Sequence, residues 1–320
     1  MSSPLFPQIE HGSFAGHETF PFRYTWLRKA IDLVSADPEA FGREDAMVHL
    51  GVGKNMVRSM RHWAMAAGVI EEDPAVTSNR GRSLRVTDFG KHLLGDDGWD
   101  PYLEDQGSLW LLHARLVSAP DWATTWYWVF NHLPQPEFTK AELSRWLLDF
   151  AAQRGWGRVA ETSIRRDVDC FLRTYVASQP GRKSPIEETL DCPLVELGLV
   201  REFGLRGHFI VSRGPQPTLP DELVAWSLAE LLGRMETTTG TVSLEKVAYA
   251  AGSPGRIFCL SEDALIARLE KLGEITLGAM TFDDTAGLRQ VLVNQKPNPE
   301  SLLKRYYRRA GSPKGARAAS

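Results

Sequence analysis

The chain has 320 residues, roughly enough for two or three domains, and its 43% hydrophobic and 24% charged content is typical of a folded protein. Its formal net charge of −3 excludes a protein that is basic all over, so any surface for nucleic acid must be a local patch. Cys170, Cys192 and Cys259 lack the spacing of a zinc ribbon or a disulfide framework, no apolar run reaches membrane-spanning length, and no secretory signal is visible. These features predict a cytoplasmic protein with no membrane partner.

The first recognisable element is a polar and aromatic segment, residues 14–23, followed by an amphipathic helix that carries Trp26. His17, Glu18 and Arg23 are candidate catalytic residues, because a histidine, a carboxylate and an arginine together can serve acid–base or metal-assisted phosphodiester chemistry. The spacing is not that of a His-Glu-x-x-His zinc site, since position 21 is proline. In the alternative interpretation, His17 and Glu18 bond to backbone groups and fix the segment against Trp26.

A helix-turn-helix pattern follows at residues 44–63. Residues 44–50 are typical of a short helix, residues 51–53 of a tight turn, and residues 54–63 of a second helix. Side chains that can bind phosphates or base edges recur on one face of the second helix, namely Lys54, Asn55, Arg58, Arg61 and His62. The alternative is an ordinary solvated helix face.

A β-hairpin is predicted directly after this helix. Gly68 can end the helix, residues 69–72 and 83–87 suit two strands, and the residues between them are rich in turn formers. Arg80 and Arg82 lie near the tip of the hairpin and are further candidates for DNA contact. A helix-turn-helix followed by a hairpin predicts a winged helix-turn-helix, which is typical of DNA-binding proteins.

The middle of the chain, residues 100–152, is rich in leucine and tryptophan. Its tryptophans can stack on bases, but their helical setting favours packing in a hydrophobic core. A second helix-then-strand unit begins near Glu161, and Arg165 and Arg166 face away from its apolar side as candidate DNA contacts. Asp167 and Asp169 form no metal-binding pair, since positions i and i+2 of a helix do not face each other.

A third unit is predicted from a helix at 260–272, ended by Gly273, and strands at 275–277 and 288–293. A glycine also lies between a helix and an apolar strand at Gly68 and Gly198, and this recurrence predicts repeated winged-helix units. Asp283 and Asp284 can bind a divalent metal, although a simple polar turn is favoured. No phosphate-binding glycine loop and no Gly-x-Ser-x-Gly elbow occur, so neither nucleotide hydrolysis nor serine hydrolase chemistry is predicted. With the cysteine spacing and the proline at position 21, no nucleotide or zinc site is evident.

Three motifs carry a resemblance to a known family. They are Phe14-x-x-His17-Glu18-Thr19-Phe20-x-x-Arg23-x-x-Trp26, the segment Leu50–Val57 and the segment Ser253–Phe258. Together they resemble a bacterial family long catalogued as a domain of unknown function, the SspB-like nickase components of single-strand DNA phosphorothioation (Ssp) systems. The resemblance covers nearly the whole chain. Arg256 of the third motif joins the candidate DNA contacts.

The resemblance implies a function in DNA modification and anti-phage defence, in which one strand is nicked and a phosphate oxygen is exchanged for sulfur. It implies cysteine desulfurase and sulfotransfer/ATPase partners, and a nickase of this kind is expected to use Mg²⁺ or Mn²⁺. No catalytic motif of the family can be placed residue by residue on this chain. A non-catalytic winged-helix DNA-binding adaptor or transcriptional regulator therefore stays open as the alternative.

The expected fold class is mainly α with small β-hairpin wings (α+β), built from repeated winged helix-turn-helix units. The expected organisation is an N-terminal loop and first winged helix at 1–99, a Trp-rich helical region with a second unit at 100–215, a third unit at 216–300 and a basic tail at 301–320. The tail includes Lys304, Arg305, Arg308, Arg309, Lys314 and Arg317 and no acidic residue, so it can hold phosphates by charge or remain a solvated terminus.

Overall fold

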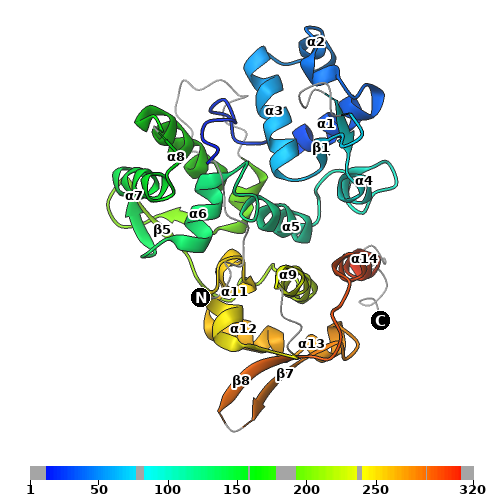
Figure 1. The fold of residues 1–320 in the computed structure, drawn as a ribbon, viewed down its shortest axis with the longest axis vertical. Helices are drawn as coiled ribbons and strands as arrows, with labels where there is room; N and C mark the ends of the chain where they lie inside the picture. Colours follow the sequence, from blue (N-terminus) through cyan, green and yellow to red (C-terminus); the bar gives the residue numbers. More distant parts are fainter. Residues whose placement is uncertain are drawn as a thin grey trace, which may run out of the picture. The chain divides into compact units, whose positions relative to one another are not determined.

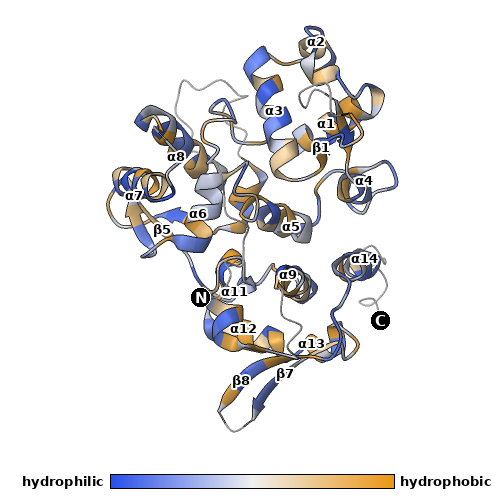
Figure 2. Ribbon diagram, viewed as in Figure 1, coloured by the Kyte–Doolittle hydropathy of each residue, from blue (hydrophilic) through white to orange (hydrophobic). Residues whose placement is uncertain are grey.

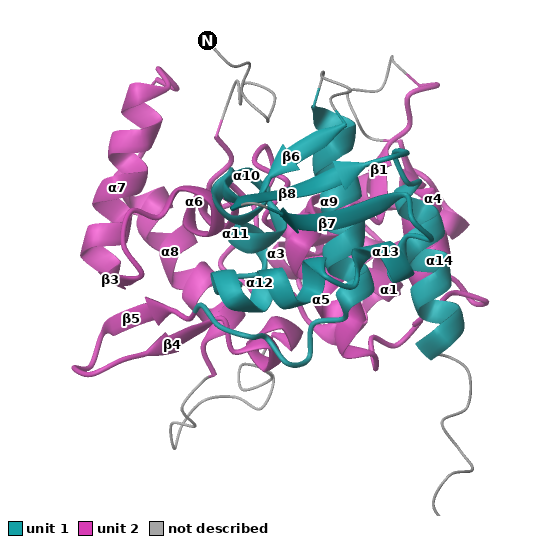
Figure 3. Ribbon diagram, turned by 90° about the horizontal axis from the view of Figure 1, so that it is seen from below, with its two compact units in different colours: residues 1–7, 213–320 teal, residues 8–212 magenta. Residues whose placement is uncertain are grey.

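A computed structural model of the chain describes residues 12–76, 83–157, 159–177, 192–235, 240–285 and 287–310 (Figure 1). The chain divides into a larger unit, residues 8–212, and a smaller unit that contains residues 213–320 (Figure 3). Both are mainly helical with small antiparallel sheets, which confirms the predicted α+β class. Among the described residues, no helix is long and apolar enough to cross a membrane.

The larger unit alternates helices with short strands. Its elements are α1 (Tyr24–Ala36), the 3-10 helix η1 (Ala40–Gly42), α2 (Ala46–Leu50), α3 (Lys54–Ala66), β1 (Ile70–Glu72), β2 (Leu84–Val86), α4 (Asp88–Leu94), α5 (Gln106–Leu116), α6 (Thr124–His132), β3 (Glu137–Thr139), α7 (Lys140–Gln153), α8 (Glu161–Tyr175), the 3-10 helix η4 (Pro193–Leu197), β4 (Val200–Glu202) and β5 (His208–Val211).

The predicted helix-turn-helix and hairpin are present at α2, α3, β1 and β2. Gly51 ends α2 in the left-handed conformation at φ 65°, which glycine adopts without steric cost, and α3 begins three residues later. Gly68, at φ 68°, separates α3 from β1. The strands pair antiparallel with Ile70 opposite Val86. The two helices and two strands that glycine placement and apolar periodicity predict within residues 44–87 are therefore confirmed.

The core of the larger unit lies among α1, α3, α5, α6 and α8. In α1 the buried residues recur at the predicted helical spacing, from Trp26 to Val34. Trp110, Trp126 and Trp128 are also buried, which confirms that these tryptophans pack in the core. In α8 one face is buried from Ile164 to Tyr175. The opposite face is exposed.

A small antiparallel sheet completes the larger unit, with strand order β3-β5-β4. Thr139, the last residue of β3, caps α7 through a capping box, in which its side chain accepts from the Glu142 backbone N–H and the Glu142 side chain accepts from the Thr139 backbone N–H. Gly198 ends η4 in the left-handed conformation before β4, as the sequence predicts. The sheet places Phe209 of β5 beside the exposed side of α8.

The smaller unit contains a second three-stranded antiparallel sheet, with order β6-β8-β7. Its elements are α9 (Asp221–Arg234), β6 (Thr241–Ser243), α10 (Leu244–Tyr249), α11 (Pro254–Ile257), α12 (Glu262–Leu269), α13 (Leu272–Ile275), β7 (Met280–Thr285), β8 (Leu288–Val293) and α14 (Pro299–Ala310). Ser261 caps α12 as predicted, since its side chain accepts from Ala264. Within the described residues, the first element of this unit is the helix α9 and the last is the helix α14.

Two sequence interpretations in the smaller unit are wrong. Gly273 does not end a helix but lies inside the short helix α13, and residues 275–277 are not a strand. The chain turns at Leu277 and Gly278, both at positive φ, and the strand begins only at Met280. Residues 301–310 of the predicted tail belong to α14, which buries Leu302, Leu303 and Tyr307 and packs on α9.

Candidate functional site

The exposed face of α3 carries four of the ten predicted DNA-contacting residues. Lys54, Asn55 and Arg58 are exposed and Arg61 is half-buried. Figure 2 shows the start of this helix as hydrophilic and its last turn as apolar. Two of the cations are paired, Arg58 with Glu18 at 3.2 Å and Arg61 with Glu72 at 3.9 Å. Surface pairs of this kind are weak, typically at most about 1 kcal/mol, so the contact with Glu18 does not prevent Arg58 from binding an anion.

His62 does not belong to this basic face, and the prediction that it lies there is wrong. Its side chain is buried and packs edge-on against the rings of His17 at 5.9 Å and Trp63 at 5.1 Å. Burial is the largest cause that lowers the pKa of His62, to about 3. The histidine is therefore neutral at pH 7 and offers no cation to DNA. His62 is buried by a tertiary contact, because the segment before α1 covers this side of α3.

That segment, residues 12–23, is called the anchor loop here. Gly16 passes so close to His62 that a Cβ atom at position 16 would lie 2.6 Å from the His62 Nδ1 atom. Only glycine fits there without displacing the ring. The sequence predicts a polar segment at this place, but its spacing gives no sign that the segment lies on α3.

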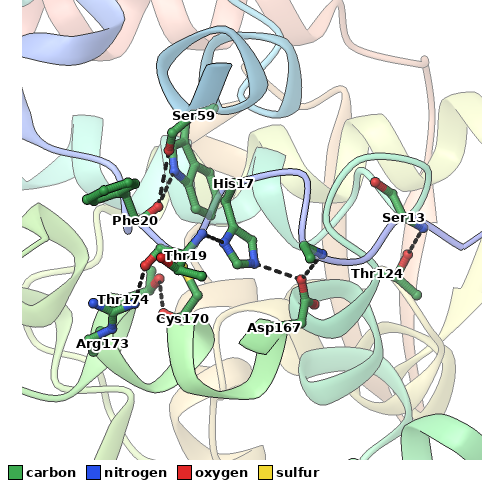
Figure 4. A network of polar contacts seen from close by, with 12 residues as sticks. Ser13, His17, Thr19, Phe20, Ser59, Thr124, Asp167, Cys170, Arg173 and Thr174 are labelled. Carbon is green, nitrogen blue, oxygen red and sulfur yellow. Dashed lines mark hydrogen bonds and ion pairs between the residues drawn. The ribbon is translucent and has the colours of Figure 1, made fainter. Parts of the chain in front are cut away.

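His17 is the central residue of the anchor loop (Figure 4). Its side chain is 1% exposed, and its ring stacks on Trp63 with centroids 5.9 Å apart. The Thr19 backbone N–H donates to Nδ1 at 3.0 Å, so this nitrogen is unprotonated and Nε2 carries the hydrogen. Nε2 donates to the Asp167 carboxylate at 2.8 Å. Both ring nitrogens are thus engaged inside the protein.

Asp167 of α8 accepts hydrogen bonds from the anchor loop. Its Oδ1 atom accepts from His17 and from the Ala15 backbone N–H at 2.7 Å, while its Oδ2 atom is buried and has no hydrogen-bond partner in the described structure. Asp169, two residues later, is exposed and pairs with Lys140 at 2.6 Å. The prediction that these two carboxylates diverge is confirmed. The importance of Asp167 could have been recognised from its position on the apolar stripe of α8, three residues after Ile164.

Further hydrogen bonds tie the anchor loop to α3 and α8 (Figure 4). The Phe20 carbonyl accepts from the Trp63 indole N–H at 2.8 Å and from the Ser59 hydroxyl at 3.3 Å. Arg173 of α8 donates to the Thr19 carbonyl. The loop therefore connects the helix with the predicted DNA-binding face to α8.

The structure directs the three predicted catalytic side chains to different partners. His17 bonds to Asp167, Glu18 pairs with Arg58, and Arg23 lies over the ring of Trp26 at 5.4 Å from its centroid. Of the three, Glu18 is the one that pairs with the exposed face of α3, through Arg58. Their catalytic role stays a prediction, but for His17 the geometry fits the alternative in which it fixes the loop. It does so against Trp63 rather than Trp26.

The other predicted contacts lie elsewhere. Arg165 and Arg166 are exposed on α8, and Arg165 pairs with Glu161 at 2.5 Å. Arg256 is half-buried in the smaller unit, where its Nε atom donates to the Tyr249 carbonyl at 3.2 Å. Burial and the neighbouring charge of Arg213 lower its pKa. The positions outside the described residues are Arg80, Arg82, Lys314 and Arg317.

No group of three or more histidine, cysteine or acidic side chains capable of holding a metal ion occurs among the described residues. Asp283 bonds to Thr285 and Gln290, and Asp284 pairs with Arg289 at 3.3 Å. Both aspartates belong to β7, where they lie opposite Gln290 and Arg289 of β8, so the prediction that they form a polar turn is wrong because the strand continues to Thr285. Cys170, Cys192 and Cys259 are buried and form no disulfide.

Comparisons with known proteins place the chain in a family. Residues 14–307 match DUF4007, a family described as proteins of unknown function. An SspB crystal structure is 34% identical, with a TM-score of 0.85 over 96% of this chain and 92% of that one. A magnesium ion-bound SspB crystal structure is also 34% identical, with a TM-score of 0.83 over 95% and 90%. No curated protein sequence matches. The chain therefore belongs to the DUF4007 family and is SspB-like along almost its whole length.

Proposed function

We propose that this protein is the DNA-binding, strand-nicking component of an Ssp-type phosphorothioation and anti-phage defence system. The observation that carries the proposal is the 34% identity to SspB over 95% of the chain. Sequence and structural similarity over nearly the whole chain is expected for proteins that have the same function in equivalent defence systems. The proposed partners are DNA and the cysteine desulfurase and sulfotransfer/ATPase proteins of that system, in the cytoplasm.

We infer further that α2, α3 and the β1–β2 hairpin act as a winged helix-turn-helix. In such units the start of the second helix enters the major groove and the hairpin lies along the backbone. Lys54, Asn55 and Arg58 are exposed within the first two turns of α3, where a recognition helix makes its base and phosphate contacts. We regard α8 with β4 and β5, and α12 with β7 and β8, as diverged repeats of the same plan.

Substitution at α3 tests this surface. Lys54→Ala and Arg58→Ala should weaken duplex binding, and each lost phosphate contact should lower the salt slope by about one unit. A lost base contact should instead relax sequence preference at a cost of about 1–3 kcal/mol. Unchanged affinity in both variants would move the duplex surface away from α3.

Nicking is tested with supercoiled plasmid. The purified protein with Mg²⁺ or Mn²⁺, alone and with the sulfur-transfer partners, should produce open-circular DNA. Mg²⁺ is the first metal to try, because one SspB crystal structure holds it. Mg²⁺ is commonly held by one or two carboxylates together with substrate phosphates, so a complete cage of protein ligands is not required. Within this chain, Glu18 beside Arg58 is the carboxylate best placed to meet DNA.

A non-catalytic DNA-binding adaptor is the second candidate. It is favoured by one observation, the divergence of His17, Glu18 and Arg23 toward separate partners. An adaptor would bind duplex DNA tightly and leave the plasmid supercoiled under every combination of metal and partner. That outcome would reject the nickase and keep the DNA-binding part of the proposal.

A further inference from the structure

The exposed side of α8 is hollowed along its length. One hollow of about 500 Å³ lies between α7 and α8, and a second of about 440 Å³ lies between α8, β5 and Thr19 of the anchor loop. Lys140 and Asp169 line both, so the two hollows meet on α8. They are called the α8 groove here. In Figure 1, α7 and α8 lie side by side, and these two helices are in contact.

The α8 groove concentrates positive charge in a chain whose formal net charge is −3. Its cationic side chains are Lys140, Arg145, Arg165, Arg166 and Arg173, against the carboxylates of Glu161 and Asp169, a local excess of three positive charges. Arg145 and Arg166 are exposed and have no ion-pair partner among the described residues. Because the chain as a whole is negatively charged, it can attract nucleic acid only through a local positive patch of this kind.

The walls between these cations are apolar. Ala141, Leu148 and Val168 line the first hollow, and Leu172, Val176 and Phe209 line the second. A single DNA strand presents phosphates on one side and unpaired, weakly polar base faces on the other, so a cationic rim above an apolar floor suits it. A duplex stacks its base faces inside the double helix, so it cannot place them on an apolar floor of this kind.

We propose that the α8 groove binds a single DNA strand, with its phosphates along the five cations and its bases on the apolar floor. Arg165 and Arg173 are eight residues apart, about 12 Å along the helix. A strand that lies along α8 can therefore meet cations over about two turns of the helix. The proposal rests on DNA being the substrate of the proposed function, and it assigns the duplex to α3 and the separated strand to α8.

Fluorescence anisotropy with two labelled probes tests the assignment, a 12-nucleotide oligo-dT and a 24-base-pair duplex in 0.1 M salt. The full-length chain carrying Arg145→Gln and Arg166→Gln is compared with a control of equal charge, Arg43→Gln and Arg154→Gln. The control arginines are exposed and do not line the groove. Melting temperatures close to that of the wild type will establish that both double variants are folded.

The groove variant should bind oligo-dT about tenfold more weakly, with a salt slope lower by about 1.4, because each single-strand phosphate contact contributes about 0.7. Its duplex affinity should stay within twofold of wild type, and the control should bind both probes like wild type. Three results would overturn the proposal. The wild-type protein does not bind oligo-dT, the groove variant binds oligo-dT as tightly as the wild type does, or the groove variant loses affinity equally for oligo-dT and for the duplex. If Lys54→Ala and Arg58→Ala leave duplex binding intact while the groove variant loses oligo-dT, the assignment of α3 fails and the groove stands.

Discussion

Replacing His62 with glutamine should remove a pH dependence of folding stability. In the folded protein the pKa of His62 is about 3, because the ring is buried against Trp63 and the anchor loop. In the unfolded chain the histidine has its ordinary pKa of about 6.5. Between these two values the unfolded state binds a proton that the folded state does not bind. Stability is therefore highest above pH 6.5 and falls as the pH is lowered through the unfolded pKa.

The magnitude follows from the two pKa values. The histidine favours unfolding by about 0.1 kcal/mol at pH 7.5 and by about 1.4 kcal/mol at pH 5.5, a difference of about 1.3 kcal/mol. This window lies above the ordinary pKa of aspartate and glutamate, so exposed carboxylates titrate little within it. For a unit of this size the difference corresponds to a fall of about 3–5 °C in melting temperature.

Urea unfolding at pH 7.5 and pH 5.5, followed by tryptophan fluorescence, measures the effect. The wild type should lose about 1.3 kcal/mol more than His62→Gln between the two pH values. His49→Gln is the matched control, because His49 is exposed on α2 with only a 3.5 Å contact to Asp45. Equal losses in wild type and His62→Gln would refute the argument that His62 is held neutral by burial.

Two further substitutions test the attachment of the anchor loop. Gly16→Ala should destabilise the protein by about 1–3 kcal/mol in urea unfolding, because its Cβ would lie 2.6 Å from the His62 ring, whereas Gly42→Ala, with no atom within 4 Å of the new Cβ, should be nearly neutral. Asp167→Ala should lower the free energy of unfolding by about 2–4 kcal/mol, since it leaves the buried His17 Nε2–H and the partly buried Ala15 N–H without an acceptor, while Asp169→Ala should cost less than about 1 kcal/mol. Comparable losses in a variant and its control would contradict the reasoning.

The sequence was sufficient to predict elements whose causes are local. Gly51 and Gly68 mark the ends of helices because of their backbone conformation, and the buried residues of α1 recur at helical spacing. Gly273 shows the limit of the same reasoning, since nothing nearby in sequence shows that the turn falls five residues later, at Gly278. Local signals identify a glycine but do not decide which glycine ends the helix.

The environment of the candidate site was less predictable, because it depends on contacts between distant residues. The helical period alone places His62 beside Arg58, whereas the anchor loop, in which Gly16 lies against its ring, buries it. The bond between His17 and Asp167 joins residues 150 positions apart. A single sequence contains no distance information at that range.

These contacts decide which substitution can identify a catalytic residue in the anchor loop. A change at His17 removes bonds to Thr19 and Asp167, so lost activity would not separate catalysis from folding. Glu18→Gln removes one charge from a half-exposed side chain whose ion pair with Arg58 is worth at most about 1 kcal/mol. If Glu18 is catalytic, nicking should collapse while melting temperature and duplex affinity stay near wild type. A folded Glu18→Gln variant that nicks plasmid at the wild-type rate would end the catalytic assignment and leave the loop as the structural connection between α3 and α8.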